Sequence, residues 1–410
     1  MLRQRIQCRR RFLISSSIIA SIALGAAACS SSASTSTGTS AGAAKTSASV
    51  ISQELAGKVP PTAKEELDQN IPLTAGQAIP GYPNGAPPSS ADMFHFTSAE
   101  IAKLKAGHYT AAIALHLSNS AWSGLQIKGI TTTLAKFGIK VVATTSANGV
   151  ASTQVSQLAT LIARKPTAMF SIAVNPTSEA TEYKQIEANG IKLILLDNVP
   201  PGMTPSQNYV TDVSANNGGN GLFAAEQLYK AIGCAPIGVI GLDYFFPVVN
   251  VRITDALKYL SEKCPHQVQY TKNLSSLVVT PAFTYASAMI AQHPDIKGFF
   301  AGWNSIAEEI VGAEKSAGVK LPIATTDIGP VSTLDLAEGY IVASGGQEPY
   351  QQGVAEADAL AYNLLGMKVP PFIELPTVPV SLADIIPAYK IVNGTNPPAD
   401  DIAAITAAGG

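Results

Sequence analysis

The sequence predicts an α/β protein with two doubly wound lobes, each built on a parallel sheet. Two observations support this. Short apolar runs without clean alternation are separated by stretches with helical spacing, which is typical of parallel strands covered on both faces. The alternation occurs twice, once from His108 and again from Pro236. A chain of 410 residues is also long enough to bury two substantial cores.

The expected elements follow in order along the chain. In the first series the sequence predicts strands at 111–115, 138–143, 168–172 and 191–196, and helices at 125–137, 155–163 and 178–188. In the second series it predicts strands at 237–240, 268–270, 298–300 and 322–324, most of them followed by a helical stretch. We expect an N-lobe over 108–215 completed by 347–375, a C-lobe over 216–346 completed by 376–390, and a C-terminal tail over 391–410.

The first 28 residues have the order of a secretory signal peptide. Five arginines precede an apolar stretch that is too short to span a membrane, and small residues then lead into Cys29. A cysteine at this place resembles the lipobox of bacterial lipoproteins, although Ala26 stands where leucine is preferred. We therefore predict lipidation of Cys29, for example by palmitate. The alternative to a lipoprotein is an ordinary secreted protein. Export could follow either the Sec or the twin-arginine route.

The next segment, 29–105, is expected to be a flexible tether followed by a spacer. Residues 30–49 are Ser, Thr, Ala and Gly with almost no large apolar side chain, so they cannot form a core. Prolines then prevent long regular elements up to about residue 90, and a short helix is expected from Ser98.

The charge of the chain argues against nucleic-acid binding, and its cysteines indicate a disulfide. Five of the 27 basic residues lie within the signal, so 22 remain against 29 acidic ones, a net charge of −7 that disfavours nucleic-acid binding. Cys234 and Cys264 form an even pair in an exported chain, each where a helix should end and a strand begin. We expect a structural disulfide, with two buried thiols as the alternative.

Polar and aromatic residues follow the expected strands. Ligand sites in doubly wound sheets lie at the carboxyl ends of the strands. The candidates there are Ser118, Asn119, Ser120, Trp122, Asn175, Asp197, Asn198, Tyr244, Asn250, Arg252, Trp303, Asn304, Asp327 and Gln347. Amides and carboxylates suit many hydroxyls, and aromatic faces pack on the C–H side of a sugar ring. For any single residue, a helix cap or an ordinary core position is the alternative.

Catalytic and cofactor motifs are missing from the sequence. It contains neither a Gly-x-Ser-x-Gly elbow nor a phosphate-binding Gly-x4-Gly-Lys-Ser/Thr loop, and its five histidines show no metal-ligand spacing. We therefore expect no catalytic residue, no metal and no cofactor. An enzyme using Asp197 or Asp327 is kept as a remote alternative.

Taken in order, these residues make the chain similar to the type I periplasmic binding proteins that serve sugar ABC transporters, the ribose-binding group in particular. The resemblance covers roughly residues 108 to 385 and includes the polar turn to Trp122, Leu195-Leu196-Asp197-Asn198, Trp303-Asn304, Thr326-Asp327 and Gln347. It implies two Rossmann-like lobes joined by a hinge, which close on one ligand and dock on a membrane permease.

The sequence departs from this family at two anchors. The family's sugar binders usually carry arginine where Asn198 stands and often another where Asn250 falls, and whether Arg252 replaces the second stays open. Arginine donates to several sugar hydroxyls at once. Because these arginines are replaced here, the ligand's identity stays open between a sugar, a polyol and another small polar molecule.

The resemblance, together with Cys29, leads us to expect a solute-binding component of an ABC importer, anchored by lipid to the outer face of the cell membrane or in the periplasm. We expect it to be a monomer. The alternative is a sensory protein that presents its ligand to a membrane receptor.

Overall fold

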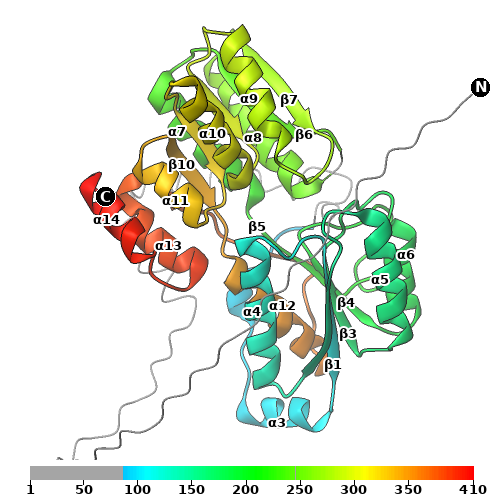
Figure 1. Cartoon of the computed structure of the whole chain (residues 1–410). Coiled ribbons are helices and arrows are strands. Elements are labelled where there is room, and N and C mark those ends of the chain that lie inside the picture. Colours follow the sequence, from blue (N-terminus) through cyan, green and yellow to red (C-terminus); the bar gives the residue numbers. More distant parts are fainter. Residues whose placement is uncertain (1–85, 245) are drawn as a thin grey trace, which may run out of the picture. The chain divides into compact units, whose positions relative to one another are not determined.

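The computed structural model describes residues 86–244 and 246–410, which form two α/β lobes (Figure 1). The signal peptide, Cys29 and most of the expected tether lie outside the described residues. Each lobe is built on one sheet, as predicted, but each sheet has six strands where the sequence predicted four.

The first sheet has the strand order β11-β5-β4-β3-β1-β2, and all its pairings are parallel. The strands are β1 (Thr110–Leu115), β2 (Lys140–Ser146), β3 (Ala168–Ser171), β4 (Lys192–Leu196), β5 (Thr211–Ala215) and β11 (Phe372–Leu375). The first five have the 2-1-3-4-5 order of a doubly wound fold, in which the chain reverses direction across the sheet between β1 and β3.

Helices cover both faces of this sheet, so the strands are buried on both sides. The helices are α4 (Ala121–Lys136), α5 (Ala151–Ala163), α6 (Ala180–Ala188) and α12 (Pro349–Leu364). Helices α4 and α12 lie on one side of the sheet, and α5 and α6 lie on the other (Figure 1). Ile113 and Phe170 share a core cluster with residues of α4 and α12, whereas the alternate residues Ala112 and Met169 share one with residues of α5 and α6. Helix α4 begins at Ala121, earlier than the predicted 125, because the Ser120 hydroxyl accepts from the Ser123 amide at 3.1 Å and caps it.

The second sheet repeats this order as β12-β10-β9-β8-β6-β7. Its strands are β6 (Ile237–Leu242), β7 (Gln269–Leu274), β8 (Gly298–Ala301), β9 (Ile323–Thr326), β10 (Ile341–Gly346) and β12 (Val378–Val380), of which only β12 is antiparallel to its neighbour. Its helices are α7 (Asn217–Ile232), α8 (Pro247–Lys263), α9 (Pro281–Gln292), α10 (Asn304–Ala317) and α11 (Pro330–Ala337).

The chain passes between the lobes three times. It leaves the first sheet after β5, returns from β10 to α12, and crosses again in the short connection from β11 to β12. Strands β5, β11 and β12 were not among the predicted strands, and β11 and β12 are only four and three residues long.

Part of the expected spacer packs on the first lobe. It contains a 3-10 helix, Ala91–Met93, and α3 (Ser98–Ala106). The Ser89 amide donates to the Phe372 carbonyl at 3.1 Å, next to edge strand β11. The Tyr362 hydroxyl accepts from the His95 amide at 2.7 Å, and Phe94 and Phe96 pack edge-on against the Tyr362 ring.

The end of the chain is helical, where the sequence predicted only a tail from residue 391. A 3-10 helix, Leu382–Asp384, leads into α13 (Ile385–Asn393) and α14 (Ala399–Ala407). Ile405 of α14 is fully buried and belongs to the apolar core. The sequence did not predict this helix, because small residues such as Ala403 and Ala404 give a weak apolar pattern.

Cys234 and Cys264 form a disulfide with a Cα–Cα distance of 5.3 Å. It joins the turn before β6 to the end of α8, beside the neighbouring strands β6 and β7. Within residues 86–410, leaving out 245, no helix is long and apolar enough to cross a membrane. Over that same range no cluster of three His, Cys, Asp or Glu could hold a metal ion.

Candidate functional site

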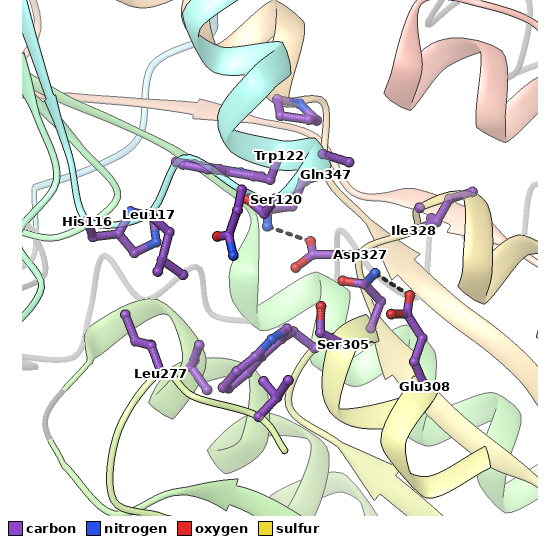
Figure 2. A pocket seen from close by; sticks show the side chains of 18 of the residues that line it. His116, Leu117, Ser120, Trp122, Leu277, Ser305, Glu308, Asp327, Ile328 and Gln347 are labelled. Atoms are coloured by element: carbon purple, nitrogen blue, oxygen red, sulfur yellow. Dashed lines mark hydrogen bonds between the residues drawn. The ribbon is translucent and has the colours of Figure 1, made fainter. Parts of the chain in front are cut away.

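A cavity of ≈ 650 Å³ lies at the carboxyl ends of the strands and is lined from both lobes (Figure 2). The first lobe contributes the turn from His116 to Trp122 after β1, and Asp197 after β4. The second contributes Trp303 and Asn304 after β8, and Asp327 after β9. This is the edge at which doubly wound sheets bind ligands.

Asp197 and Asp327 occupy equivalent positions in the two lobes. Each follows the fourth strand of its series, and each has a left-handed backbone, with φ of 64° and 65°. The Asp197 amide donates to the Val213 carbonyl at 3.1 Å, and the Asp327 amide donates to the Gly345 carbonyl at 2.9 Å. A left-handed conformation is uncommon outside glycine and concentrates at functional sites. Both lobes therefore present a carboxylate to one cavity.

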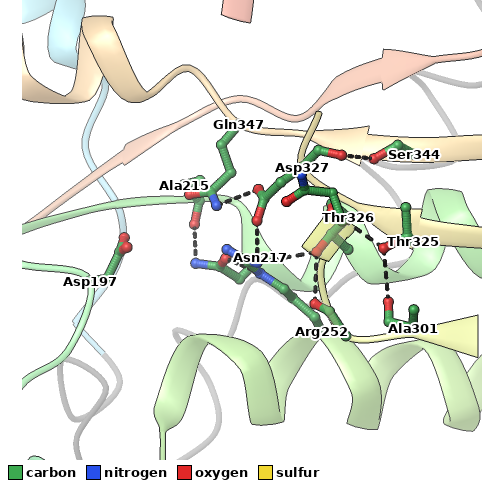
Figure 3. Close-up of polar contacts among 12 residues, drawn as sticks. Asp197, Ala215, Asn217, Arg252, Ala301, Thr325, Thr326, Asp327, Ser344 and Gln347 are labelled. Carbon is green, nitrogen blue, oxygen red and sulfur yellow. Dashed lines mark hydrogen bonds and ion pairs between the residues drawn. The ribbon is translucent and has the colours of Figure 1, made fainter. Parts of the chain in front are cut away.

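Internal hydrogen bonds fix the Asp327 carboxylate (Figure 3). Its Oδ2 accepts from Arg252 Nη1 at 2.9 Å, and its Oδ1 accepts a short hydrogen bond from Gln347 Nε2. Arg252 is buried, and its Nε donates to Asn217 Oδ1 at 2.7 Å while Nη1 also donates to Thr326 Oγ1 at 3.1 Å. The guanidinium therefore orients Asp327 and Asn217 and is held in place by them.

Asp197 is more deeply buried, and burial raises its pKa to about 6 although the Arg252 charge opposes the shift. Its Oδ1 accepts from Ser214 Oγ at 2.8 Å and from Gln352 Nε2 at 3.0 Å. Behind it, away from the cavity lining, Asp212 and Glu356 are fully buried, and burial raises the pKa of both carboxyls well above their ordinary values.

Aromatic side chains from both lobes lie around the cavity. The His116 ring is 5.8 Å from the Phe246 ring in a stacked arrangement and 5.7 Å from the Trp122 ring edge-on. Burial lowers the pKa of His116 to about 4, so the imidazole is neutral at pH 7. Trp303 lines the cavity from the second lobe. Such rings suit the C–H face of a sugar ring.

The structure brings most of the residues predicted from the sequence to this cavity. Those that line it are Asn119, Ser120, Trp122, Asp197, Arg252, Trp303, Asn304, Asp327 and Gln347. They come from both lobes: eight follow β1, β4, β8, β9 and β10 directly, and Arg252 lies on α8 after β6.

Three predicted residues lie outside the lining for local reasons. Asn175 Oδ1 accepts from the amides of Thr177 and Ser178 at 3.1 and 3.0 Å, so it holds the turn before α6. Asn250 Oδ1 accepts from the Phe246 amide at 2.7 Å at the start of α8, and Ser118 is exposed. Both asparagines therefore bond to backbone near the start of a helix, which is the structural role expected as the alternative to ligand binding.

The other two predicted residues outside the lining are Asn198 and Tyr244. Asn198 is buried, and its Oδ1 accepts from the Val248 amide of the second lobe at 3.4 Å, so it contacts the other lobe rather than the cavity. The Tyr244 ring packs edge-on against Phe246 at 6.2 Å. Tyr244 therefore supports a cavity residue from behind.

Several lining residues were missed by the sequence analysis. Asn148 follows β2, and residues 277–280 follow β7, so the same rule would have found them with correct strand ends. Glu308 lies one turn after Asn304 on α10, and its Oε1 accepts from Asn304 Nδ2 at 2.9 Å. That spacing is a usable signal. His116 ends the β1 region and was not singled out.

Comparison with known proteins identifies the family. Residues 111–368 match the family described as periplasmic binding protein domain. No curated protein matches this sequence.

Solved structures share the fold at low identity. An ABC transporter solute-binding protein from Agrobacterium vitis, bound with alpha-D-tagatopyranose, is 19% identical with a TM-score of 0.63, covering 68% of this chain and 96% of that one. A carbohydrate transporter solute-binding protein from Agrobacterium radiobacter, in complex with D-arabinose, is 19% identical with a TM-score of 0.64, covering 70% and 99%.

A sugar ABC transporter subunit from Rhodobacter sphaeroides is 23% identical with a TM-score of 0.58, covering 67% of this chain and 98% of that one. The family match spans more than half of the chain. The chain therefore belongs to the periplasmic binding protein family.

Proposed function

We propose that this chain is the extracytoplasmic solute-binding component of an ABC importer. It holds a small polyhydroxylated ligand, a sugar or a polyol, between its two lobes and delivers it to a permease in the membrane. The observation that carries the proposal is the pair of equivalent aspartates, Asp197 and Asp327, which face one cavity from the two lobes. Structural neighbours in complex with tagatose and arabinose support the class of ligand.

The chemistry of the cavity supports binding rather than turnover. Asp327 is already held by Arg252 and Gln347, an arrangement that orients a hydrogen-bond acceptor. Carboxylates, amides and aromatic rings together match the alternating polar and C–H surfaces of a sugar. The ligand's hydroxyls would donate to Asp197 and Asp327, and its ring would pack on the tryptophans.

A thermal-shift screen against pentoses, hexoses and polyols tests ligand binding. A ligand present at 100 times its Kd is expected to stabilise the protein by about 2.7 kcal/mol. If none of these compounds raises the Tm, sugar binding is rejected. Deletion of the gene is then expected to abolish uptake of the stabilising compound, and unchanged uptake would reject the transport role.

We also propose that lipid on Cys29 anchors the protein to the outer face of the cell membrane and that the protein acts as a monomer. The anchor is supported by the basic, apolar and small-residue order before Cys29. Radiolabelled palmitate is expected to label the wild type and not Cys29→Ala. Equal labelling of both would refute the anchor and leave the binding function standing.

A further inference from the structure

One histidine lies where the two lobes touch. His116 follows β1 of the first lobe, and its ring stacks on Phe246, the residue that precedes α8 of the second lobe, with 5.8 Å between the ring centroids. Trp122 of its own lobe packs edge-on against the same imidazole at 5.7 Å. The His116 side chain is therefore covered partly by its own lobe and partly by the other one.

Two further contacts link the lobes in the same region. Asn198 Oδ1 of the first lobe accepts from the Val248 amide of the second at 3.4 Å. The Gly149 amide donates to the His116 carbonyl at 2.8 Å, and a Cβ on Gly149 would lie 3.9 Å from Leu277 Cβ of the second lobe. His116 therefore belongs to a surface on which one lobe meets the other.

The imidazole in this position is suited to its neutral form. His116 is 8% exposed, and its Nδ1 is buried without a hydrogen-bond partner among the described residues. Burial lowers the pKa of His116 from 6.5 to about 4 and is the only cause of the shift. An added proton would leave a buried positive charge without a counter-charge, which is costly.

The charged groups around the cavity do not compensate such a proton. The titratable or charged groups that line the cavity or lie on the elements packed against His116 are Asp197 after β4, Asp243 and Tyr244 before α8, Arg252 on α8, Glu308 on α10 and Asp327 after β9. Residues 117–124, 147–150, 172–174 and 275–280 carry none. None of these charges contributes to the pKa shift of His116, so covering or uncovering the ring decides its protonation.

Separation of the lobes changes the surroundings of this ring. The cavity is lined from both lobes, so they must separate for a ligand to enter or leave, as the proposed function requires. Separation takes Phe246 away from the imidazole and admits water, and the pKa of His116 then returns toward its ordinary value of 6.5. The open form therefore takes up a proton from solvent below about pH 6.5, whereas the closed form does so only near pH 4.

We propose that His116 makes ligand binding proton-sensitive, because a proton on its imidazole holds the two lobes apart and releases the ligand in acid. This inference rests on the proposed function and adds a regulator to the same site. The sign follows from linkage, since the closed, ligand-bound form binds fewer protons than the open form. Affinity is therefore highest above pH 6.5 and falls as the pH drops toward 4.

Calorimetric titration at pH 7.5 and pH 5 tests this inference. The probes are D-arabinose, L-arabinose, D-ribose, D-galactose, D-tagatose and D-mannitol. With a pKa of 6.5 in the open form and about 4 in the closed form, wild-type affinity is expected to fall about 10- to 30-fold more at pH 5 than that of His116→Phe or His116→Asn. Asp197, whose pKa is also about 6, is present in all three proteins.

The protons released on ligand binding give a second readout. At pH 6 the open imidazole is mostly protonated and the closed one is neutral, so closure expels the proton to solvent. Titrations in two buffers of different ionisation enthalpy count these protons. The wild type is expected to release about 0.5–0.8 proton more per ligand than His116→Phe. A histidine with a packing role alone would leave this number unchanged.

His266→Asn is the matched control for His116→Asn, because His266 is exposed and lies outside the cavity lining. It is expected to keep the wild-type pH dependence, and the Tm of each variant at both pH values establishes that it is folded. If a probe binds at pH 7.5 and the wild type weakens at pH 5 by less than about twofold, or no more than the His116 variants, the inference is overturned and the proposed function stands. If no probe binds, the proposed function fails and the inference with it.

Discussion

At the scale of single residues, the Asp327 carboxylate is the charged acceptor of the proposed site. Its two oxygens accept from Arg252 and Gln347, which aim it at the cavity as a charged acceptor. Asp327→Asn removes that charge and leaves the buried Arg252 without its ion-pair partner. Hydrogen bonds to charged groups contribute about 1.5–3 kcal/mol, so we expect ligand affinity to fall by about 10- to 100-fold in calorimetry.

The matched control is Asp400→Asn, which changes the same side chain at an exposed position on α14. It is expected to leave the Kd unchanged. Equal Kd values for wild type and Asp327→Asn would show that Asp327 does not contribute to ligand binding.

The raised pKa of Asp197 makes the free energy of unfolding fall as the pH rises. Because burial raises its folded-state pKa from 3.8 to about 6, the folded protein holds this proton more tightly than the unfolded chain does. The resulting stabilisation is complete below pH 3.8 and is lost as the pH rises through about 6. Between pH 4 and 7.5 the wild type is expected to lose ~2–3 kcal/mol of unfolding free energy relative to Asp197→Asn.

Urea unfolding of both proteins at several pH values measures this difference. Burial also raises the pKa of Asp212 and Glu356, and the Asp197 charge adds to both shifts, so the difference between the two proteins includes the response of these two carboxyls. Parallel pH profiles for the two proteins would show that Asp197 does not titrate in this range.

At the scale of elements, helix α4, which carries Trp122, packs closely against α12 on the first lobe. A Cβ on Gly129 of α4 would collide with the Tyr350 carbonyl oxygen of α12, whereas a Cβ on Gly124 of α4 would meet no atom within 4 Å. We expect Gly129→Ala to cost about 1–3 kcal/mol through overpacking, and Gly124→Ala to stabilise by up to about 1 kcal/mol through helix propensity. Thermal unfolding of the pair checks this, and equal Tm values would contradict the close approach.

The Cys234–Cys264 disulfide constrains the second lobe between α7 and β7. Its cysteines are 30 residues apart in sequence, and closing a loop of that length lowers the entropy of the unfolded chain. The Cys234→Ser/Cys264→Ser variant is expected to be less stable by about 3–4 kcal/mol in urea unfolding. Unfolding of the wild type with reductant should match the variant, and an unchanged midpoint in both would show that the bond contributes nothing.

At the scale of the whole molecule, repetition made the fold predictable from the sequence. Apolar strands alternating with helices twice over indicated two doubly wound lobes, and the strand-end rule then led to nine lining residues, among them Trp303 and Gln347. The rule failed for Asn175 and Asn250, whose side chains accept hydrogen bonds from nearby backbone amides. The residue type alone does not tell whether a side chain after a strand bonds to its own loop or to a ligand. It also missed Glu308, which enters the cavity through the geometry of α10.

The proposed function requires that both lobes hold one ligand at once. A crystal structure of the protein purified from its own cells, with any ligand it retains, tests this most directly. We expect a hydroxylated ligand in the cavity, with hydrogen bonds to Asp197 or Trp122 of the first lobe and to Asp327 or Asn304 of the second. A ligand bound outside this cavity, or held by residues of one lobe alone, would show that the two lobes do not share a ligand.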